Sequence, residues 1–219
     1  MPQLAACLKD EFVQFLPVVM TALLSDASKD IDFKIVDAKE AELEDGEEDE
    51  TPEIQKMQIA IKGVEGTKQI QMNTSVLENK IMAIQVIRKI ASSLGKLFFS
   101  QVEVVSKLVT ESLMRDKFSS AIRKESTKML NTLLMCTNDS EQMKVLINLY
   151  LPALGMQINT RLAAPQGPDF RSVKWLMQET ARCFNHFYNY GGAFLTDEMA
   201  VNLVGLMGKV LEQVSIDKE

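Results

Sequence analysis

One segment of this 219-residue sequence concentrates most of its charge. Residues 39–50 hold eight acids and one base, a net charge of −7, which leaves +1 for all other residues together. Acids at this density repel one another and cannot join a hydrophobic core, so we predict a solvated segment. A second, compatible hypothesis is an electrostatic arm that attracts basic partners. The carboxylates assigned to that role are Glu42, Glu44, Asp45, Glu47, Glu48, Asp49 and Glu50.

Cys183 and His186 are the other residues whose types and spacing suggest chemistry, as a metal pair or a nucleophile with its base. A separation of three places them at neighbouring positions of a helix. No third ligand or orienting acid stands at a compatible spacing, so packing or a surface position is favoured. The acidic run lacks the spacing of a calcium loop, and glycine-rich phosphate motifs and common hydrolase motifs are absent. The sequence predicts no enzyme, no metal and no cofactor.

The composition narrows the class of protein. Hydrophobic residues make up 46 %, charged residues 25 % and aromatic residues 6 % of the chain, as in helix-rich globular proteins. The nearly neutral body lacks the basic excess of a nucleic-acid binder, and no apolar run reaches the roughly 18 residues of a membrane span. Cys7, Cys136 and Cys183 are odd in number and far apart, which indicates free thiols and a cytosolic or nuclear protein.

The spacing of apolar residues predicts the helices that must position these side chains. Apolar side chains recur at helical spacing in three pairs of helices, expected near 75–114, 118–160 and 168–215. Their connections are short, so the two helices of each pair should be antiparallel. The pairs begin 43 and about 50 residues apart, which is the period of a HEAT-type repeat. Pro152 falls inside a helix and should bend it.

A different pattern interrupts these helices. After the acidic run, Met57, Ile59 and Ile61 alternate with polar residues, as do Ile70 and Met72. A Gly-Val-Glu-Gly turn between the two runs predicts a short β-hairpin. The fold class is therefore an all-α superhelix, a HEAT/ARM-like solenoid with a long acidic insertion and a small β-hairpin. The expected units are a truncated repeat at 1–28, the acidic insertion and hairpin at 29–73, and repeats at 74–115, 116–164 and 165–219.

Aromatic residues gather near the C-terminal end. We interpret Trp175 as a core anchor rather than a binding hot spot. A cluster follows, which we expect to pack between repeats. Its members are Phe184, Phe187, Tyr188 and Tyr190.

An ordered set of short runs resembles a known family. The set comprises Cys-Leu-Lys-Asp-Glu-Phe at 7–12, Phe-Leu-Pro at 15–17, the acidic segment, Leu-Glu-Asn-Lys at 77–80, and Ala-Ile-Arg with Glu-Ser at 121–126. In this order, and over essentially the whole chain, it resembles the middle of the large nuclear import receptors of the importin-β superfamily, specifically the importin beta-3 type. The tryptophan that often follows the acidic loop of that family is absent, and Ile54 and Met57 stand near its place.

The resemblance implies a function in nuclear transport. Such receptors bind cargo proteins, carry them through nuclear pores by contacts with nucleoporins, and release them on binding the GTP-loaded GTPase Ran, so they work in cytoplasm and nucleus. Their second helices line the concave surface, where acidic residues recognise basic partners. The resemblance implies neither direct nucleic-acid binding nor a membrane. A rival hypothesis stays open: a HEAT-repeat scaffold or regulatory subunit, as in phosphatase or translation complexes.

Overall fold

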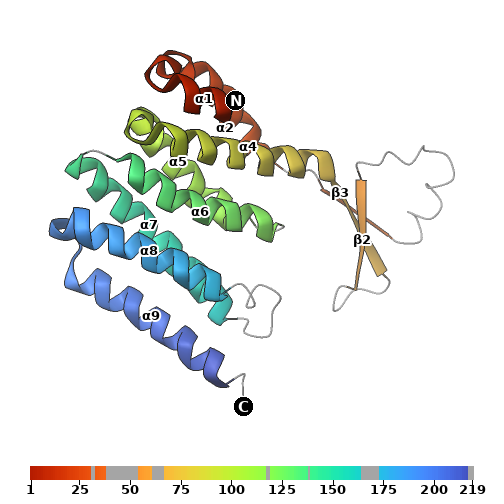
Figure 1. Cartoon of the computed structure of the whole chain (residues 1–219). Coiled ribbons are helices and arrows are strands. Elements are labelled where there is room, and N and C mark those ends of the chain that lie inside the picture. The colour runs from red at the N-terminus through yellow and green to blue at the C-terminus, as the bar shows by residue number, and fades with distance from the viewer. Residues whose placement is uncertain are drawn as a thin grey trace.

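The computed structural model describes residues 1–30, 33–37, 54–60, 67–116, 119–137, 139–163 and 173–216. Helices dominate these residues and stack in sequence order from the N-terminus to the C-terminus (Figure 1). The predicted fold class, an α-helical solenoid with a small sheet in its insertion, is confirmed. The α-helices are α1 (Pro2–Leu8), α2 (Leu16–Ser28), α4 (Thr74–Leu94), α5 (Phe99–Glu111), α6 (Ser120–Cys136), α7 (Ser140–Leu162), α8 (Val173–Gly191) and α9 (Asp197–Ile216).

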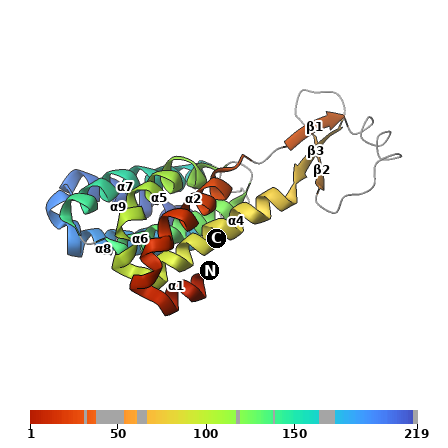
Figure 2. The same cartoon turned by 90° about the horizontal axis from the view of Figure 1, so that it is seen from above.

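The helices form two layers, seen from above in Figure 2. In one layer α6 packs between α4 and α8, and α1 packs against the other side of α4. In the second layer α7 packs between α5 and α9. Each pair also touches the next one across the layers, through α5 with α6 and α7 with α8.

The core lies between and within the layers. Helix α5 shows how the apolar stripe is used, because Val102, Val105 and Val109 share one face and are all at most 1 % exposed. Phe98, just before this helix, is fully buried as well. Full burial of a Val or Phe side chain contributes about 1.5–3 kcal/mol each, so a few such stripes hold each pair in the stack.

Local signals in the sequence set the helix ends. Gly95 ends α4 with φ of 53°, a left-handed conformation that glycine adopts without steric cost. Ser119 Oγ accepts a hydrogen bond from the Ile122 backbone N–H at 3.3 Å and caps α6. Asp139 Oδ1 accepts from the Glu141 N–H at 3.2 Å and caps α7. The chain therefore reverses tightly between α4 and α5, and again between α6 and α7.

Prolines lie within α2 and α7. In the truncated repeat at 1–28, α2 begins at Leu16, after a 3-10 helix at Lys9–Phe15. Pro17 is then the second residue of α2, where its missing N–H leaves no helical hydrogen bond unmade. Pro152 lies inside α7, which continues through it from Ser140 to Leu162. The bend at Pro152 stays a prediction.

The insertion contains a three-stranded antiparallel sheet in the order β1-β3-β2. The predicted hairpin is formed by β2 (Ile54–Ala60) and β3 (Thr67–Asn73), with Met57 opposite Ile70. Strand β1 (Phe33–Asp37) was not predicted, because five residues in a mixed stretch carry too short an alternation. It pairs with β3 and adds the third strand that a small sheet needs for stability. The sheet lies beyond the N-terminal end of α4 (Figure 2).

The contact between α8 and α7 generates a first prediction. A Cβ atom added at Gly191 would lie 2.7 Å from Met143 Cγ and 2.9 Å from Ile147 Cδ1, whereas at Gly192 it would meet nothing within 4 Å. We expect Gly191→Ala to lower the free energy of unfolding by about 1–3 kcal/mol through overpacking. Gly192→Ala is the matched control and should stay within about 0.5 kcal/mol of the parent chain. Urea denaturation measures both, and equal stability of the two variants contradicts this packing.

Candidate functional site

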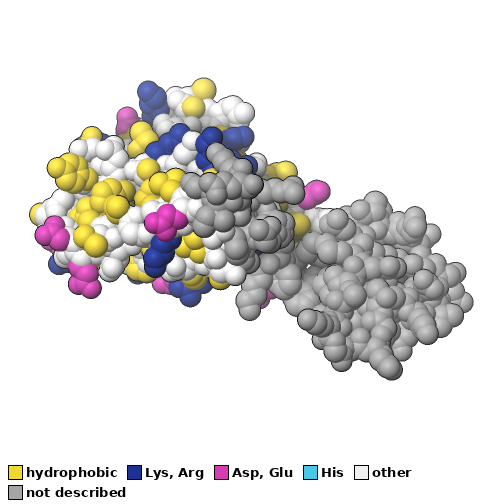
Figure 3. Space-filling view, turned by 90° about the horizontal axis from the view of Figure 1, so that it is seen from below, with side chains coloured by type: hydrophobic (Ala, Val, Ile, Leu, Met, Phe, Trp, Pro, Cys, Tyr) yellow, Lys and Arg dark blue, Asp and Glu magenta, His cyan; other side chains and the backbone are white. Residues whose placement is uncertain are grey.

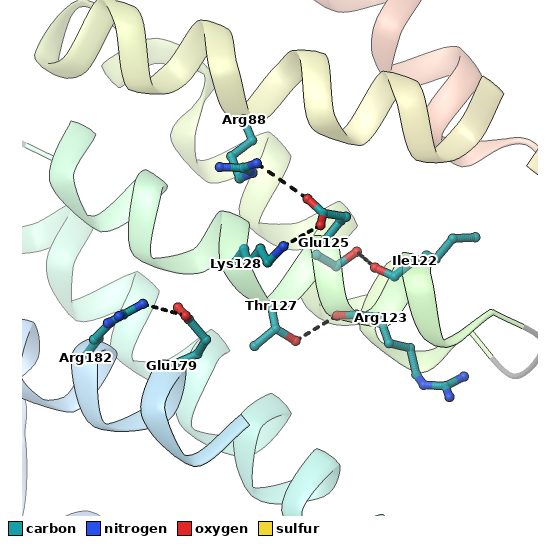
Figure 4. Close-up of polar contacts among 9 residues, drawn as sticks. Arg88, Ile122, Arg123, Glu125, Thr127, Lys128, Glu179 and Arg182 are labelled. Atoms are coloured by element: carbon teal, nitrogen blue, oxygen red, sulfur yellow. Dashed lines mark hydrogen bonds and ion pairs between the residues drawn. The ribbon is translucent and has the colours of Figure 1, made fainter. Parts of the chain in front are cut away.

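Charged side chains join the first two full pairs of helices. Glu125 on α6 has only 13 % of its side chain exposed and accepts a hydrogen bond from Lys128 Nζ at 2.6 Å. Arg88 of α4 points at the same carboxylate, with Nη2 3.6 Å from Oε2 (Figure 4). That distance marks an ion pair rather than a hydrogen bond. Two cations thus compensate one largely buried carboxylate, as a buried charge requires.

A second polar cluster joins α6 to α8. Asn131 Nδ2 donates to Glu179 Oε2 at 2.6 Å, and Arg182 Nη1 donates to the other oxygen of that carboxylate at 2.6 Å (Figure 4 shows the Arg182 contact). The Cys183 thiol donates to Asn131 Oδ1 at 3.2 Å. Asn131 therefore uses both ends of its amide to hold the adjacent helix, and the cluster serves packing.

The other layer has its own buried polar contacts. Tyr150 of α7 and Ser106 of α5 share a hydrogen bond of 2.7 Å between hydroxyl groups that lie wholly in the core. Burial raises the pKa of Tyr150, although the hydrogen bond with Ser106 partly opposes this rise. Gln157, also on α7, donates from Nε2 to the Met114 carbonyl oxygen. These contacts fix how α7 is placed against α5 along the axis of the stack.

The predicted neighbourhood of Cys183 and His186 is present on α8 but does not form a reactive pair. Cys183 is fully buried, and burial is the main cause that raises the pKa of its thiol, with the charge of Glu179 acting in the same direction. The His186 ring lies against the Tyr190 ring at an interplanar angle of 36°, with 4.6 Å between ring centroids. Partial burial lowers the pKa of His186, and a hydrogen bond to the Leu134 backbone opposes the shift. Among the described residues no group of three or more His, Cys, Asp or Glu could hold a metal ion.

The C-terminal aromatic residues divide into two sets. Phe187 is fully buried and packs on Tyr150, with 6.1 Å between ring centroids, as predicted for a contact between repeats. Trp175 is partly buried against the core, and Lys124 Nζ lies 5.7 Å from its ring centroid. The prediction was wrong for Tyr188 and Tyr190, which are each 70 % exposed. Helical spacing puts them on α8 but not on its buried face.

Exposed apolar side chains also gather on α9. Val201, Val204 and Leu211 are between 56 and 68 % exposed. The face of the molecule that α9 forms carries many hydrophobic side chains (Figure 3). Repeat proteins bury surfaces of this kind against a neighbouring unit, and apolar patches mark interaction sites.

A groove of about 610 Å³ runs between α7 and α9. Its floor is apolar and its rim carries three asparagines, and none of its lining residues is charged. These asparagines were not predicted as site residues from the sequence. The sequence contains one signal for two of them. Asn148 and Asn159 are 11 residues apart, and this spacing places both on the same face of an α-helix. The lining residues are Ile147, Asn148, Leu151, Pro152, Gly155, Met156, Asn159, Thr160, Met199, Asn202, Leu203 and Leu206.

The carboxylates at 42–50 that were predicted to attract basic partners lie outside the described residues. Their role stays a prediction. The elements that carry the acidic segment are described, since β1 precedes it and β2 follows it in one sheet. In the parts of the chain that the structure covers, no helix is long and apolar enough to cross a membrane.

The fold places this chain with α-solenoid proteins, and solved structures of the karyopherin Kap121p are similar to it. The chain superposes on Kap121p bound to Nup53p with a TM-score of 0.73 and 19 % identity, covering 96 % of this chain and 19 % of that one. The karyopherin Kap121p bound to the extreme C-terminus of the protein phosphatase Cdc14p gives a TM-score of 0.70 and 20 % identity over 96 % of this chain and 19 % of that one. Kap121p bound to RanGTP gives 0.64 and 20 % over 94 % of this chain and 21 % of that one.

The likeness to Kap121p is a likeness of fold, and the chain spans about a fifth of the length of those proteins. No protein-family model matches the sequence. No curated protein matches it either. Nearly the whole chain nevertheless follows one stretch of a karyopherin solenoid.

The hydrogen bond between Tyr150 and Ser106 generates a second prediction. We expect Tyr150→Phe to cost about 1–3 kcal/mol in the free energy of unfolding, because the buried Ser106 hydroxyl loses its partner. The double variant Tyr150→Phe with Ser106→Ala should recover part of that loss. Tyr188→Phe, at an exposed hydroxyl, is the control and should change stability by under about 0.5 kcal/mol. Tyr150→Phe with unchanged stability in urea denaturation contradicts this assignment.

The three cysteines generate a third prediction. Cys7 is exposed, while Cys136 and Cys183 are buried. Burial raises the pKa of the Cys136 thiol to about 12, and that of Cys183 is also raised, so at pH 8 both stay protonated and unreactive. A chromogenic disulfide reagent should therefore modify one thiol quickly in the native chain and all three in urea. Cys7→Ser should abolish the fast phase, and its persistence would show that a buried thiol is accessible.

Proposed function

We propose that this chain is a section of a nuclear import receptor of the importin beta-3 type. It binds cargo proteins, contacts nucleoporins and responds to Ran, and it works in cytoplasm and nucleus. The observation that carries the proposal is the superposition of 96 % of the chain on a karyopherin at a TM-score of 0.73. The ordered sequence runs at 7–12, 15–17, 77–80 and 121–126 support it independently.

The architecture suits this role because a stack of helix pairs presents an extended surface rather than one closed site. Solved structures of Kap121p hold Nup53p, RanGTP or the extreme C-terminus of Cdc14p. We carry these kinds of partner over to the present protein: a nucleoporin, Ran and cargo segments. The units at 1–28, 74–115, 116–164 and 165–219 would act as consecutive repeats of that surface. The unit at 29–73 would be an insertion between two of them.

The acidic segment is the proposed contact for basic partners. Its net charge of −7 is set into a chain whose other residues sum to +1, so the attraction would be local. A basic partner would be attracted from a distance and then bound by the neighbouring repeats. The sheet fixes where the chain enters and leaves this segment: Asp37 at the end of β1 lies opposite Lys68, and Ile54 at the start of β2 lies opposite Asn73, at the other end of β3.

Ran-dependent release tests the proposal. The full-length protein is captured from cell extract with its partners and washed with Ran locked in the GTP-bound form. A transport receptor should release cargo to GTP-locked Ran and keep it in the presence of Ran loaded with GDP, which is the control. Partners that stay bound in both nucleotide states contradict transport and favour the rival scaffold or regulatory subunit.

Neutralising the acidic segment gives the fourth prediction. The variant replaces its carboxylates by the matching amides at Glu42, Glu44, Asp45, Glu47, Glu48, Asp49 and Glu50. Association with a lysine-rich reporter peptide, measured by stopped-flow fluorescence, should slow several-fold at low salt. The difference should shrink near physiological salt, where the Debye length is about 8 Å. Thermal stability should hardly change, because exposed charges away from packing contribute under about 0.5 kcal/mol.

A matched control removes acids elsewhere on the surface. Asp197→Asn, Glu198→Gln and Glu212→Gln change exposed residues of α9 and should leave the association rate nearly unaltered. Equal association rates for the acidic-segment variant and the parent chain at low salt refute the attraction. A large loss of thermal stability refutes it in another way, since the segment would then contribute to packing.

A further inference from the structure

We propose that the groove between α7 and α9 binds an extended, uncharged peptide segment anchored by one aliphatic side chain. The proposal rests on the proposed function, in that it names a class of partner for a receptor that binds other proteins. It concerns a site separate from the acidic segment, with the opposite chemical character.

The dimensions of the groove fit an extended chain. On α7 the lining residues run from Ile147 to Thr160, about 20 Å along the helix at 1.5 Å per residue. An extended peptide covers that length with roughly six residues. The volume of about 610 Å³ lies in the usual range of binding pockets, and the site is drawn out along α7.

The rim of the groove offers groups that match a peptide backbone. Asn148, Asn159 and Asn202 line it, are exposed, and have side-chain amides without a hydrogen bond to any other described residue. Each amide has donors and an acceptor, as a peptide unit does. Pro152 has no N–H to donate to the Asn148 carbonyl one turn earlier, so the helix itself adds an acceptor at the same place.

The floor selects an aliphatic anchor. Leu151 and Leu203 are buried beneath the groove and Leu206 is partly buried, which makes an apolar seat. Gly155 leaves room on this seat, because a Cβ there would meet only Leu206 Cδ1, at 3.6 Å. A side chain of Leu, Ile or Met would fill the space above Gly155. A lysine or aspartate anchor would be desolvated without a partner, since no charged residue lines the groove.

The fifth prediction tests the groove with peptides. A display library of random ten-residue peptides is selected on the purified chain, and binders that also recognise Gly155→Leu are removed. The enriched peptides should be uncharged and share one aliphatic position. Fluorescence anisotropy of the most enriched peptide should show about tenfold weaker binding to Gly155→Leu, which fills the seat. Gly205→Leu is the matched control on exposed α9 surface and should bind like the parent chain.

A second set of variants keeps the test independent of folding. Asn148→Ala, Asn159→Ala and Asn202→Ala change exposed side chains, so the fold should be retained, and the triple variant should bind about tenfold more weakly. Enriched peptides that are basic, or that bind the triple variant and Gly155→Leu like the parent chain, overturn the proposal. Concentration-dependent dimers that Gly155→Leu abolishes overturn it too, because a second copy then fills the groove.

The two proposals can fail separately. If Gly155→Leu loses the selected peptide while Ran-dependent release is absent, the groove is a peptide site on a protein that is no transport receptor. If Ran-dependent release is present and no peptide depends on the groove, the receptor assignment stands and the groove assignment is wrong.

Discussion

The structure depends on one constraint: an amphipathic helix pair cannot bury its apolar stripe by itself and must stack on its neighbours. Helix α6 illustrates the constraint, since it lies between α4 and α8 and shields both from water. The contacts are mostly between elements that follow closely in sequence, so the stack needs no long-range closure. An extended shape follows, together with much more surface per residue than a closed core would leave.

Apolar burial is not directional, and a stack held by it alone could slide or rotate. Buried polar contacts in both layers remove that freedom. Glu179 holds the first layer through its hydrogen bond with Asn131 on the adjacent helix, and the Tyr150–Ser106 hydrogen bond holds the second layer. Each of these groups is costly if its partner is misplaced, because a buried polar atom without a hydrogen bond has lost its hydration. They therefore select one alignment of neighbouring pairs.

Two surfaces with different chemistry emerge from this scaffold. The acidic segment would act at long range on charged partners and lose strength in salt. The α7–α9 groove would act only on contact, through an apolar seat and three amide side chains. In a receptor with both kinds of site, the acidic segment would set the rate of association with a partner. The groove would determine which peptide segment is bound. The buried thiols of Cys136 and Cys183 belong to the packing that supports these surfaces.

Much of the fold follows from short-range patterns in the sequence. The helix pairs, the left-handed Gly95 and the hairpin of β2 and β3 are predictable because hydrophobic period and backbone preference act within a few residues. The pairing of β1 with β3 is different, since its two strands come from opposite ends of the insertion. Likewise, helical spacing placed Tyr188 and Tyr190 on α8, but the prediction that they pack between repeats was wrong, because both side chains are exposed.

The candidate groove needed the tertiary structure. Spacing alone places Asn148 and Asn159 on one face of α7. Asn202 lines the same groove only because α9 packs beside α7. The space above Gly155 likewise depends on Leu206 of α9, whose Cδ1 would lie at van der Waals distance, 3.6 Å, from a Cβ added at Gly155. The hydrophobic periodicity of a helix predicts which of its faces is buried. It does not predict which neighbouring helix packs on that face. That choice is made by the fit of whole helices against one another, a property of residues far apart in the chain.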